Sequence, residues 1–181
     1  MADETTFMLR VTTGEQTQDF LLSAKNIEAI ISSALEDSAE FAGFYAAAAH
    51  HPAAGVRRAA AAQNSIPGDA VLDLADDPST SVRVQAVCNT MFRRTASEGM
   101  VLALIESDPD VADAVAGSVS VFENADIDVI CEAISRHPDP NVRRTLAWNS
   151  ATPVKWLKRL RQDSTREVAE TATKELASRM G

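Results

Sequence analysis

Short apolar segments recur along this chain, and several of them follow a turn that contains proline. The prolines at positions 52, 78, 109 and 138 are 26, 31 and 29 residues apart, which leaves room for two short helices and two turns per unit. Apolar residues spaced at one helical turn, such as Val111, Val115 and Val119, predict helices with one buried face. The first helix of each unit is predicted over residues 56–62, 82–87, 111–122 and 142–148, and the second over residues 70–75, 100–105, 129–134 and 154–160.

A short phrase repeats at the start of these units. In three copies an arginine follows the proline by five residues, at Arg57, Arg83 and Arg143. A degenerate copy begins at Asp108-Pro109, with Val111-Ala112 in place of the Val-Arg pair, and a half-copy without proline begins at Asp163. A period of this size indicates stacked helical repeats, so we predict a mainly all-α fold, a right-handed α-solenoid of about four to five units. The predicted repeat domain covers residues 51–181.

Two polar positions of the repeat have predicted structural roles. Arginine at the start of a helix is disfavoured by the helix dipole, so we expect each arginine to pair with an acidic turn residue and to link units. The acidic candidates are Asp77, Asp108 and Asp139. An asparagine follows each arginine by six or seven residues, at Asn64, Asn89 and Asn149, where a short amide caps a helix or bridges turns. The alternative for both rows of residues is ligand binding.

The pattern Asp-Pro-x-x-x-Val-Arg, short helix, asparagine and leucine-rich helix resembles the leucine-rich repeat variant family. The best match runs from His137-Pro138 through Val142-Arg143 and Asn149 to Leu160. The resemblance covers about residues 50–175, and because the units are longer than that family's, they also look like HEAT repeats. Some members of the variant family carry an iron–sulfur module, which needs a cysteine cluster, and no cysteine precedes Cys88. The resemblance therefore implies no cofactor here.

Residues 1–50 lie outside the repeat and are predicted to cap it. Apolar runs at residues 7–11 and 19–22, separated by polar residues, suit a small β-hairpin, and a helix from about Thr17 is the alternative. Ser23 is a candidate cap for an amphipathic helix that contains Ile27 and Ile31, and a second helix is expected over residues 38–50. If the hairpin forms, its free edge could instead pair with another copy and make a homodimer.

Charge is unevenly distributed in a chain whose net charge is −9. Residues 1–136 carry 21 acidic and 8 basic side chains, whereas residues 137–181 carry 5 acidic and 9 basic ones. Four of these cations lie on one predicted helix, at Lys155, Lys158, Arg159 and Arg161. They form either a solvated face near a helix C-terminus or a docking patch for an acidic protein partner or a phosphate-bearing ligand.

Residues with catalytic or metal-binding chemistry are few and do not form a motif. Cys88 and Cys131 lie among apolar residues in predicted helices, which favours buried core positions over a disulfide or a regulatory thiol. His51 and His137 occupy the turn position that Asp77 fills elsewhere, so they are expected to be turn residues rather than ligands or bases. We find no known catalytic signature, no apolar run of membrane-spanning length and no secretory signal, and we expect a cytoplasmic protein that is not an enzyme.

The predicted function is therefore a non-catalytic protein–protein interaction module with a solenoid surface. The alternative is a nucleic-acid-binding or base-excising enzyme resembling the HEAT-like alkylpurine DNA glycosylases. In that hypothesis Trp148 or Trp156 stacks on a base, and Asp126 or Asp128 assists. Those enzymes need a basic groove, whereas the middle repeats here are acidic, so nucleic acid is disfavoured as a partner.

Overall fold

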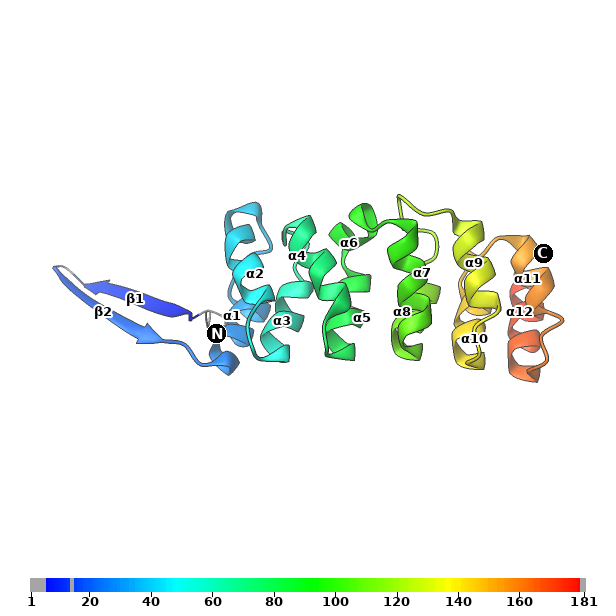
Figure 1. Ribbon diagram of the computed structural model, residues 1–181, viewed down its shortest axis with the longest axis horizontal. Coiled ribbons are helices and arrows are strands. Elements are labelled where there is room, and N and C mark those ends of the chain that lie inside the picture. Colours follow the sequence, from blue (N-terminus) through cyan, green and yellow to red (C-terminus); the bar gives the residue numbers. More distant parts are fainter. Residues whose placement is uncertain (1–5, 14, 180–181) are drawn as a thin grey trace. The chain divides into compact units, whose positions relative to one another are not determined.

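The computed structural model describes residues 6–13 and 15–179 and is mainly helical, with one small antiparallel hairpin (Figure 1). The prediction of a mainly all-α fold with a small N-terminal hairpin is confirmed at this level. The chain divides into two compact units, residues 1–91 and 92–181, and we describe each by itself. The predicted boundary after residue 50 stays a prediction.

The hairpin of the first unit consists of β1 (Met8–Thr13) and β2 (Gln16–Leu21). The strands pair one to one, from Met8 opposite Leu21 to Thr13 opposite Gln16, so the alternative helix from about Thr17 is wrong. An ion pair between Arg10 and Asp19 (2.7 Å) crosses the strands. All the residues of both strands are exposed to solvent.

Seven helical segments follow in the first unit. They are α1 (Ala24–Ser33), η1 (Ala39–Phe41), α2 (Ala42–Ala49), α3 (Ala54–Ala61), α4 (Gly68–Asp73), η2 (Leu74–Asp76) and α5 (Thr80–Cys88). Ser23 caps α1, as predicted, because its hydroxyl accepts the Asn26 N–H. Helix α3 packs against α1, α2 and α5, and its alanines are buried there because small side chains allow helices to approach closely.

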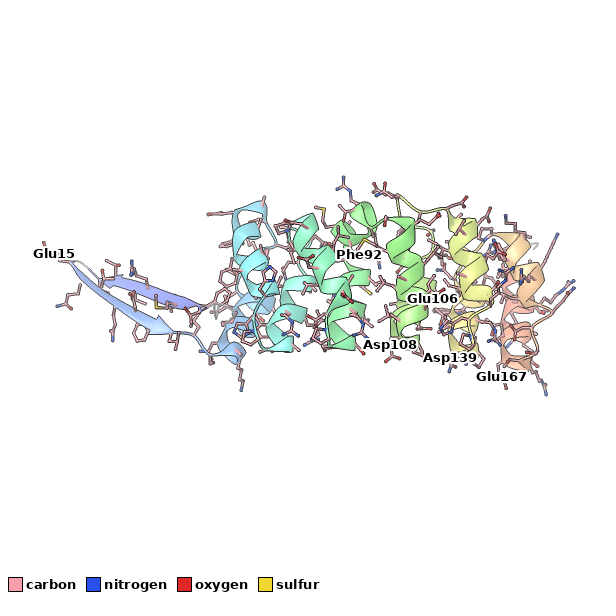
Figure 2. The ribbon with its side chains drawn as sticks, in the orientation of Figure 1. Glu15, Phe92, Glu106, Asp108, Asp139 and Glu167 are labelled. Atoms are coloured by element: carbon pink, nitrogen blue, oxygen red, sulfur yellow. The ribbon has the colours of Figure 1, made fainter. Side chains whose placement is uncertain are left out.

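Helix α6 (Thr90–Thr95) crosses the division between the units, and the sequence analysis did not predict it. The second unit continues with α7 (Glu98–Ser107), α8 (Pro109–Gly117), α9 (Ile127–Ser135), α10 (Pro140–Trp148), α11 (Val154–Leu160) and α12 (Arg166–Ser178). Helix α10 packs against both α8 and α12, whereas α9 contacts α7 and α11. Figure 2 shows Asp108, Asp139 and Glu167 at the same end of this unit, so α8, α10 and α12 run in the same direction.

The starts of these helices follow from local chemistry. Pro109 and Pro140 are the first residues of α8 and α10, where a missing N–H costs nothing. The carboxylates of Asp108 and Asp139 accept the N–H groups of the residues two positions later and cap the two helices. Helix starts were therefore predictable to within a few residues.

The predicted extension of α8 to Phe122 is wrong. The helix ends at Gly117, and the Ser118 N–H then binds the Val115 carbonyl. Val119 and Phe122 are nevertheless buried, because the segment after the helix folds back onto the core. Apolar spacing alone does not distinguish a further helical turn from such a segment.

Candidate functional site: turn-bound arginines and the basic face of helix α11

The repeated arginines bind both a turn and a carboxylate. In the first unit, Arg57 donates from Nε and Nη2 to the two oxygens of Asp77, at 2.6 and 2.9 Å. Its Nη1 also donates to the carbonyls of His51 and Pro52, both at 2.8 Å. The guanidinium thus connects the turn before its own helix to the turn before the next one, and both charged side chains are largely buried.

The second unit repeats this arrangement with Arg143. Its Nε and Nη2 donate to Asp163 at 2.8 and 2.9 Å, and its Nη1 donates to the carbonyls of His137 and Pro138. Asp163 lies twenty residues after Arg143, the same separation as between Arg57 and Asp77. Asp139, which was an expected partner, caps α10 instead. The equal separation is the sequence signal that would have identified Asp163.

Arg83 occupies the same position on α5. Its Nη1 donates to the Asp77 carbonyl at 2.7 Å, as Arg57 and Arg143 do to the carbonyls of their own turns. Its Nη2 donates to the Thr80 hydroxyl at 3.0 Å. The arginine of each copy therefore binds the main chain of the turn that precedes its helix.

These ion pairs change the acidity of the carboxylates. Burial opposes ionisation of Asp77, but hydrogen bonds from Arg57 and from the Ser79 N–H outweigh it and hold the pKa of Asp77 below its ordinary value. The Arg143 guanidinium is the main cause of the lowered pKa of Asp163, and the Thr165 N–H adds to it. Both aspartates therefore stay ionised to a lower pH than an ordinary aspartate.

The two turn histidines take the place of these aspartates in geometry as well as in sequence. His51 Nδ1 accepts the Ala53 N–H at 3.0 Å, and His137 Nδ1 accepts the Asp139 N–H at 3.1 Å. Asp77 and Asp163 accept the N–H two residues later in the same way. Both histidines are nearly buried. They act in the structure as turn residues, as predicted.

The residue in the turn, histidine or aspartate, corresponds to the residue at the fourth helical position of the preceding copy. His137 follows the degenerate copy, in which Ala112 stands at the fourth helical position, where α3 and α10 have Arg57 and Arg143. Where the arginine is present, as in the copy before Asp163, the next turn has aspartate. Imidazole can accept the turn N–H but offers no charge for a guanidinium, so the two positions are matched to each other.

The repeated asparagines bridge helix ends. The Asn89 amide is buried and donates to the carbonyls of Ala61 and Gln63, both at 2.8 Å, at the C-terminal end of α3. Asn149 donates to the Ala116 carbonyl at 3.0 Å, at the end of α8. The corresponding Asn64 instead donates to Asp37, from its backbone and its side chain. The amides of Asn89 and Asn149 thus satisfy carbonyls that helix ends leave unpaired.

Helix α11 and its C-cap, Arg161, carry the four predicted docking residues on the solvent side. Lys155, Lys158, Arg159 and Arg161 are all exposed, and Trp156, Leu157 and Leu160 are buried beneath them. The alternation follows the helical period, with the apolar stripe packed on α9 and α12. The helix therefore holds the cations on a rigid support.

Trp156 and Asp128 fix this face to α9. The indole Nε1 donates to Asp128 at 2.9 Å, and Lys155 Nζ lies 2.6 Å from the other oxygen of the same carboxylate. The hydrogen bonds from Lys155 and Trp156 lower the pKa of Asp128. Lys155 and Arg159 also lie 5.6 Å from the centroid of the indole ring, within cation–π range. The sequence analysis did not foresee Asp128 as the anchor of this face.

The remaining cations differ from Lys155. Within residues 6–13 and 15–179, Lys158, Arg159 and Arg161 have no carboxylate partner in an ion pair. We call Lys158, Arg159 and Arg161 the basic face of α11. It is available to an acidic ligand without first breaking an ion pair of the described structure.

The residues of the base-excision hypothesis lie in different environments. Trp156 is buried and Asp128 is paired, and the Asp126 carboxylate caps α9 by accepting the Asp128 N–H. Trp148 is 76% exposed and lines a shallow hollow of about 290 Å³ with Arg144, Thr145 and Thr171. A stacking role for tryptophan would thus require Trp148.

The two cysteines have different surroundings. Cys131 is buried in α9, and burial raises the pKa of its thiol to about 12. Cys88 is exposed at the end of α5, so the expectation that both are core residues is wrong for Cys88. Both are free thiols.

Two further features are absent from the described part of the chain, a metal site and a membrane-spanning helix. Its His, Cys, Asp and Glu side chains form no group of three suited to a metal ion. None of its helices is long and apolar enough to cross a membrane. A comparison of the chain with family models, with curated proteins and with solved structures finds no match.

Proposed function

We propose that this chain is a non-catalytic protein–protein interaction module, and that the basic face of α11 binds an acidic segment of a partner protein. The observation that carries the proposal is the set of three exposed cations that have no carboxylate partner among the described residues, on a helix whose other side is buried. Trp156 and Asp128 keep that helix in place, so binding costs little ordering of the main chain.

The architecture we propose is a right-handed α-solenoid of HEAT-like units, similar to the leucine-rich repeat variant family. Supporting it, α3 packs on α1 and α5 in the first unit, and α10 packs on α8 and α12 in the second. The pairs Arg57–Asp77 and Arg143–Asp163 link successive turns in the way a stacked repeat requires. A cytoplasmic location belongs to the same proposal.

Charge favours an acidic protein segment over nucleic acid as the ligand. The chain has a net charge of −9, and nucleic-acid affinity depends mostly on many simultaneous phosphate contacts. Three cations within four residues at the C-terminal end of α11 match a short acidic peptide better than they match a duplex. Because the side chains are exposed, we expect binding to weaken as salt is added.

The test is binding of a fluorescein-labelled, Glu- and Asp-rich peptide by fluorescence anisotropy. The variant Lys158→Glu, Arg159→Glu, Arg161→Glu should bind at least about tenfold more weakly than the wild type, since three favourable charges become repulsive. The matched control is Lys25→Glu, Arg144→Glu, Lys174→Glu, which makes the same change in net charge at exposed positions on α1, α10 and α12 that form no ion pair among the described residues. Circular dichroism checks that both variants fold.

The control decides between local and general electrostatics. If both triple variants lose the peptide equally, only the net charge matters and the proposed face is wrong. If labelled duplex DNA binds more tightly than the peptide at 150 mM salt, and the α11 variant loses it, the ligand is nucleic acid and the interaction-module proposal is overturned.

A further inference from the structure

The hairpin exposes apolar side chains on both of its faces. Met8 and Leu21 are 61% and 73% exposed, and Leu9, Val11 and Phe20 are also exposed on the opposite face of the ribbon. An isolated hairpin is marginally stable in water, and independent stability needs a third strand or packing against a helix. Every residue of β1 and β2 is exposed, so no helix of the described structure covers the ribbon, and further strands would stabilise it.

The base of the hairpin is fixed to the helices of its own unit. Phe7 is buried and packs edge-on against Phe44, with ring centroids 4.9 Å apart. The Leu22 N–H donates to the Phe7 carbonyl at 2.9 Å and closes the ribbon. Figure 1 shows β1 and β2 leaving the helices from this point, and Figure 2 places Glu15 at the far end. The strands are thus presented on a defined base.

The Phe7–Leu22 bond determines which backbone groups point outward. In an antiparallel pair, bonded and non-bonded residue pairs alternate along the strands. Since Phe7 and Leu22 are bonded, Thr12 and Thr17 form a non-bonded pair, as do Arg10 and Asp19. The N–H and C=O groups of Arg10 and Thr12 therefore form the free edge of β1, and those of Thr17 and Asp19 form the free edge of β2.

The edge of β1 lacks the features that prevent pairing. Natural edge strands are blocked by proline, lysine, bulges or inward-pointing charges. β1 contains no proline or lysine, and it pairs one to one with β2 without a bulge. Its single charge, on Arg10, is already neutralised by Asp19. A second copy would meet an edge of the same kind without net electrostatic repulsion.

We propose that two copies of this chain associate through β1, with their edges antiparallel across a two-fold axis, to form a four-stranded sheet. The register that fits places Val11 opposite Val11 of the partner subunit. Arg10 then lies opposite Thr12 of the partner subunit, so like charges do not face each other. The edge of β2 is less suitable because the equivalent register places the polar Gln18 opposite Gln18 of the partner subunit, where β1 brings two β-branched apolar side chains together. This surface is separate from the basic face of α11.

The sharpest test compares two prolines on opposite edges. Thr12 and Thr17 face each other across the hairpin, and both have outward N–H groups. Proline is tolerated where the N–H of an edge strand faces solvent. Thr12→Pro removes two bonds per dimer and should weaken self-association about 30-fold by sedimentation analysis. Thr17→Pro, the matched control, should leave the dissociation constant of the dimer within about threefold of the wild-type value.

A crosslink tests the register in a second way. Val11→Cys in a Cys88→Ser background places the two new thiols across a non-bonded pair, where Cα atoms lie about 4.5 Å apart, within the range of a disulfide. Mild oxidation should give a covalent dimer, and Leu9→Cys in the same background should give less. The proposal is overturned if the full wild-type chain is monomeric up to about 100 μM. It is also overturned if Thr17→Pro is as disruptive as Thr12→Pro, or if Val11→Cys does not crosslink.

Discussion

Arg143 binds both carboxylate oxygens of Asp163, at 2.8 and 2.9 Å, while its remaining nitrogen holds the turn at His137 and Pro138. One side chain therefore joins two turns that begin 26 residues apart, at His137 and Asp163. Arg57 and Asp77 do the same in the first unit. Both pairs are bidentate, charge-assisted bonds. Because both partners are largely buried, solvent screens these bonds less than it screens a surface ion pair.

The matching of arginine to aspartate predicts an energetic coupling. Arg143→Ala with Asp163→His reproduces the combination that the chain itself uses at Ala112 and His137. We expect each single variant to lose about 1–3 kcal/mol of the free energy of unfolding, because each leaves a charged group poorly paired. The double variant should lose less than the sum, with a coupling of about 1 kcal/mol or more in urea denaturation. Additive losses would show that the two positions are independent.

The same pairs predict a loss of stability in acid. The pKa values of Asp77 and Asp163 are lowered in the folded state, so both carboxylates stabilise the fold above their unfolded pKa of about 4. That stabilisation is lost as the pH falls below about 4, through the folded-state values. Urea denaturation between pH 2 and 6 should show the loss. Asp163→Asn should flatten the dependence, whereas Asp19→Asn, at an exposed pair, should not change it measurably.

Replacing the buried Asn89 amide should lower the free energy of unfolding more than replacing an exposed amide does. Asn89→Ala leaves the carbonyls of Ala61 and Gln63 without their donor, so we expect a loss of about 1–3 kcal/mol in thermal or urea unfolding. Asn124→Ala removes a similar bond to the Arg94 carbonyl at an exposed site and should cost less than about 0.5 kcal/mol. Equal costs would contradict a bridging role for Asn89.

Thiol reactivity separates the two cysteines. Cys88 is exposed, whereas Cys131 is buried with its pKa raised to about 12, so little thiolate forms there at neutral pH. In the folded protein a thiol reagent should modify Cys88 rapidly and Cys131 at least about 100-fold more slowly, because Cys131 requires local opening. Cys88→Ser should remove the fast phase. A fast phase that persists would place Cys131 at an accessible site.

Trp148 provides the test of the enzymatic alternative. It is exposed, so Trp148→Ala should change stability by less than about 0.5 kcal/mol. If the protein is an interaction module that uses α11, the wild type should release no alkylated purine from duplex DNA, and Trp148→Ala should bind the acidic peptide as the wild type does. Base release that disappears in Trp148→Ala would favour the glycosylase hypothesis.

The sequence by itself determined the elements whose causes are local. The Asp and Pro residues at the starts of α8 and α10, the Ser23 cap and the two apolar runs of the hairpin act over a few positions, and the structure has each of these elements. The buried face of α8, with Val111 and Val115, was readable for the same reason, because i and i+4 neighbours share a helix face whatever packs on it.

Tertiary structure alone decided what depends on neighbours distant in the chain. It pairs Arg143 with Asp163 rather than Asp139, because packing of α10 on α12 brings that turn within reach. It also exposes Cys88 while it buries Cys131, although the apolar neighbours of both had predicted core positions. Hydrophobic pattern selects the inward face of a helix, but the position of the adjacent helix decides which residues at its ends are covered.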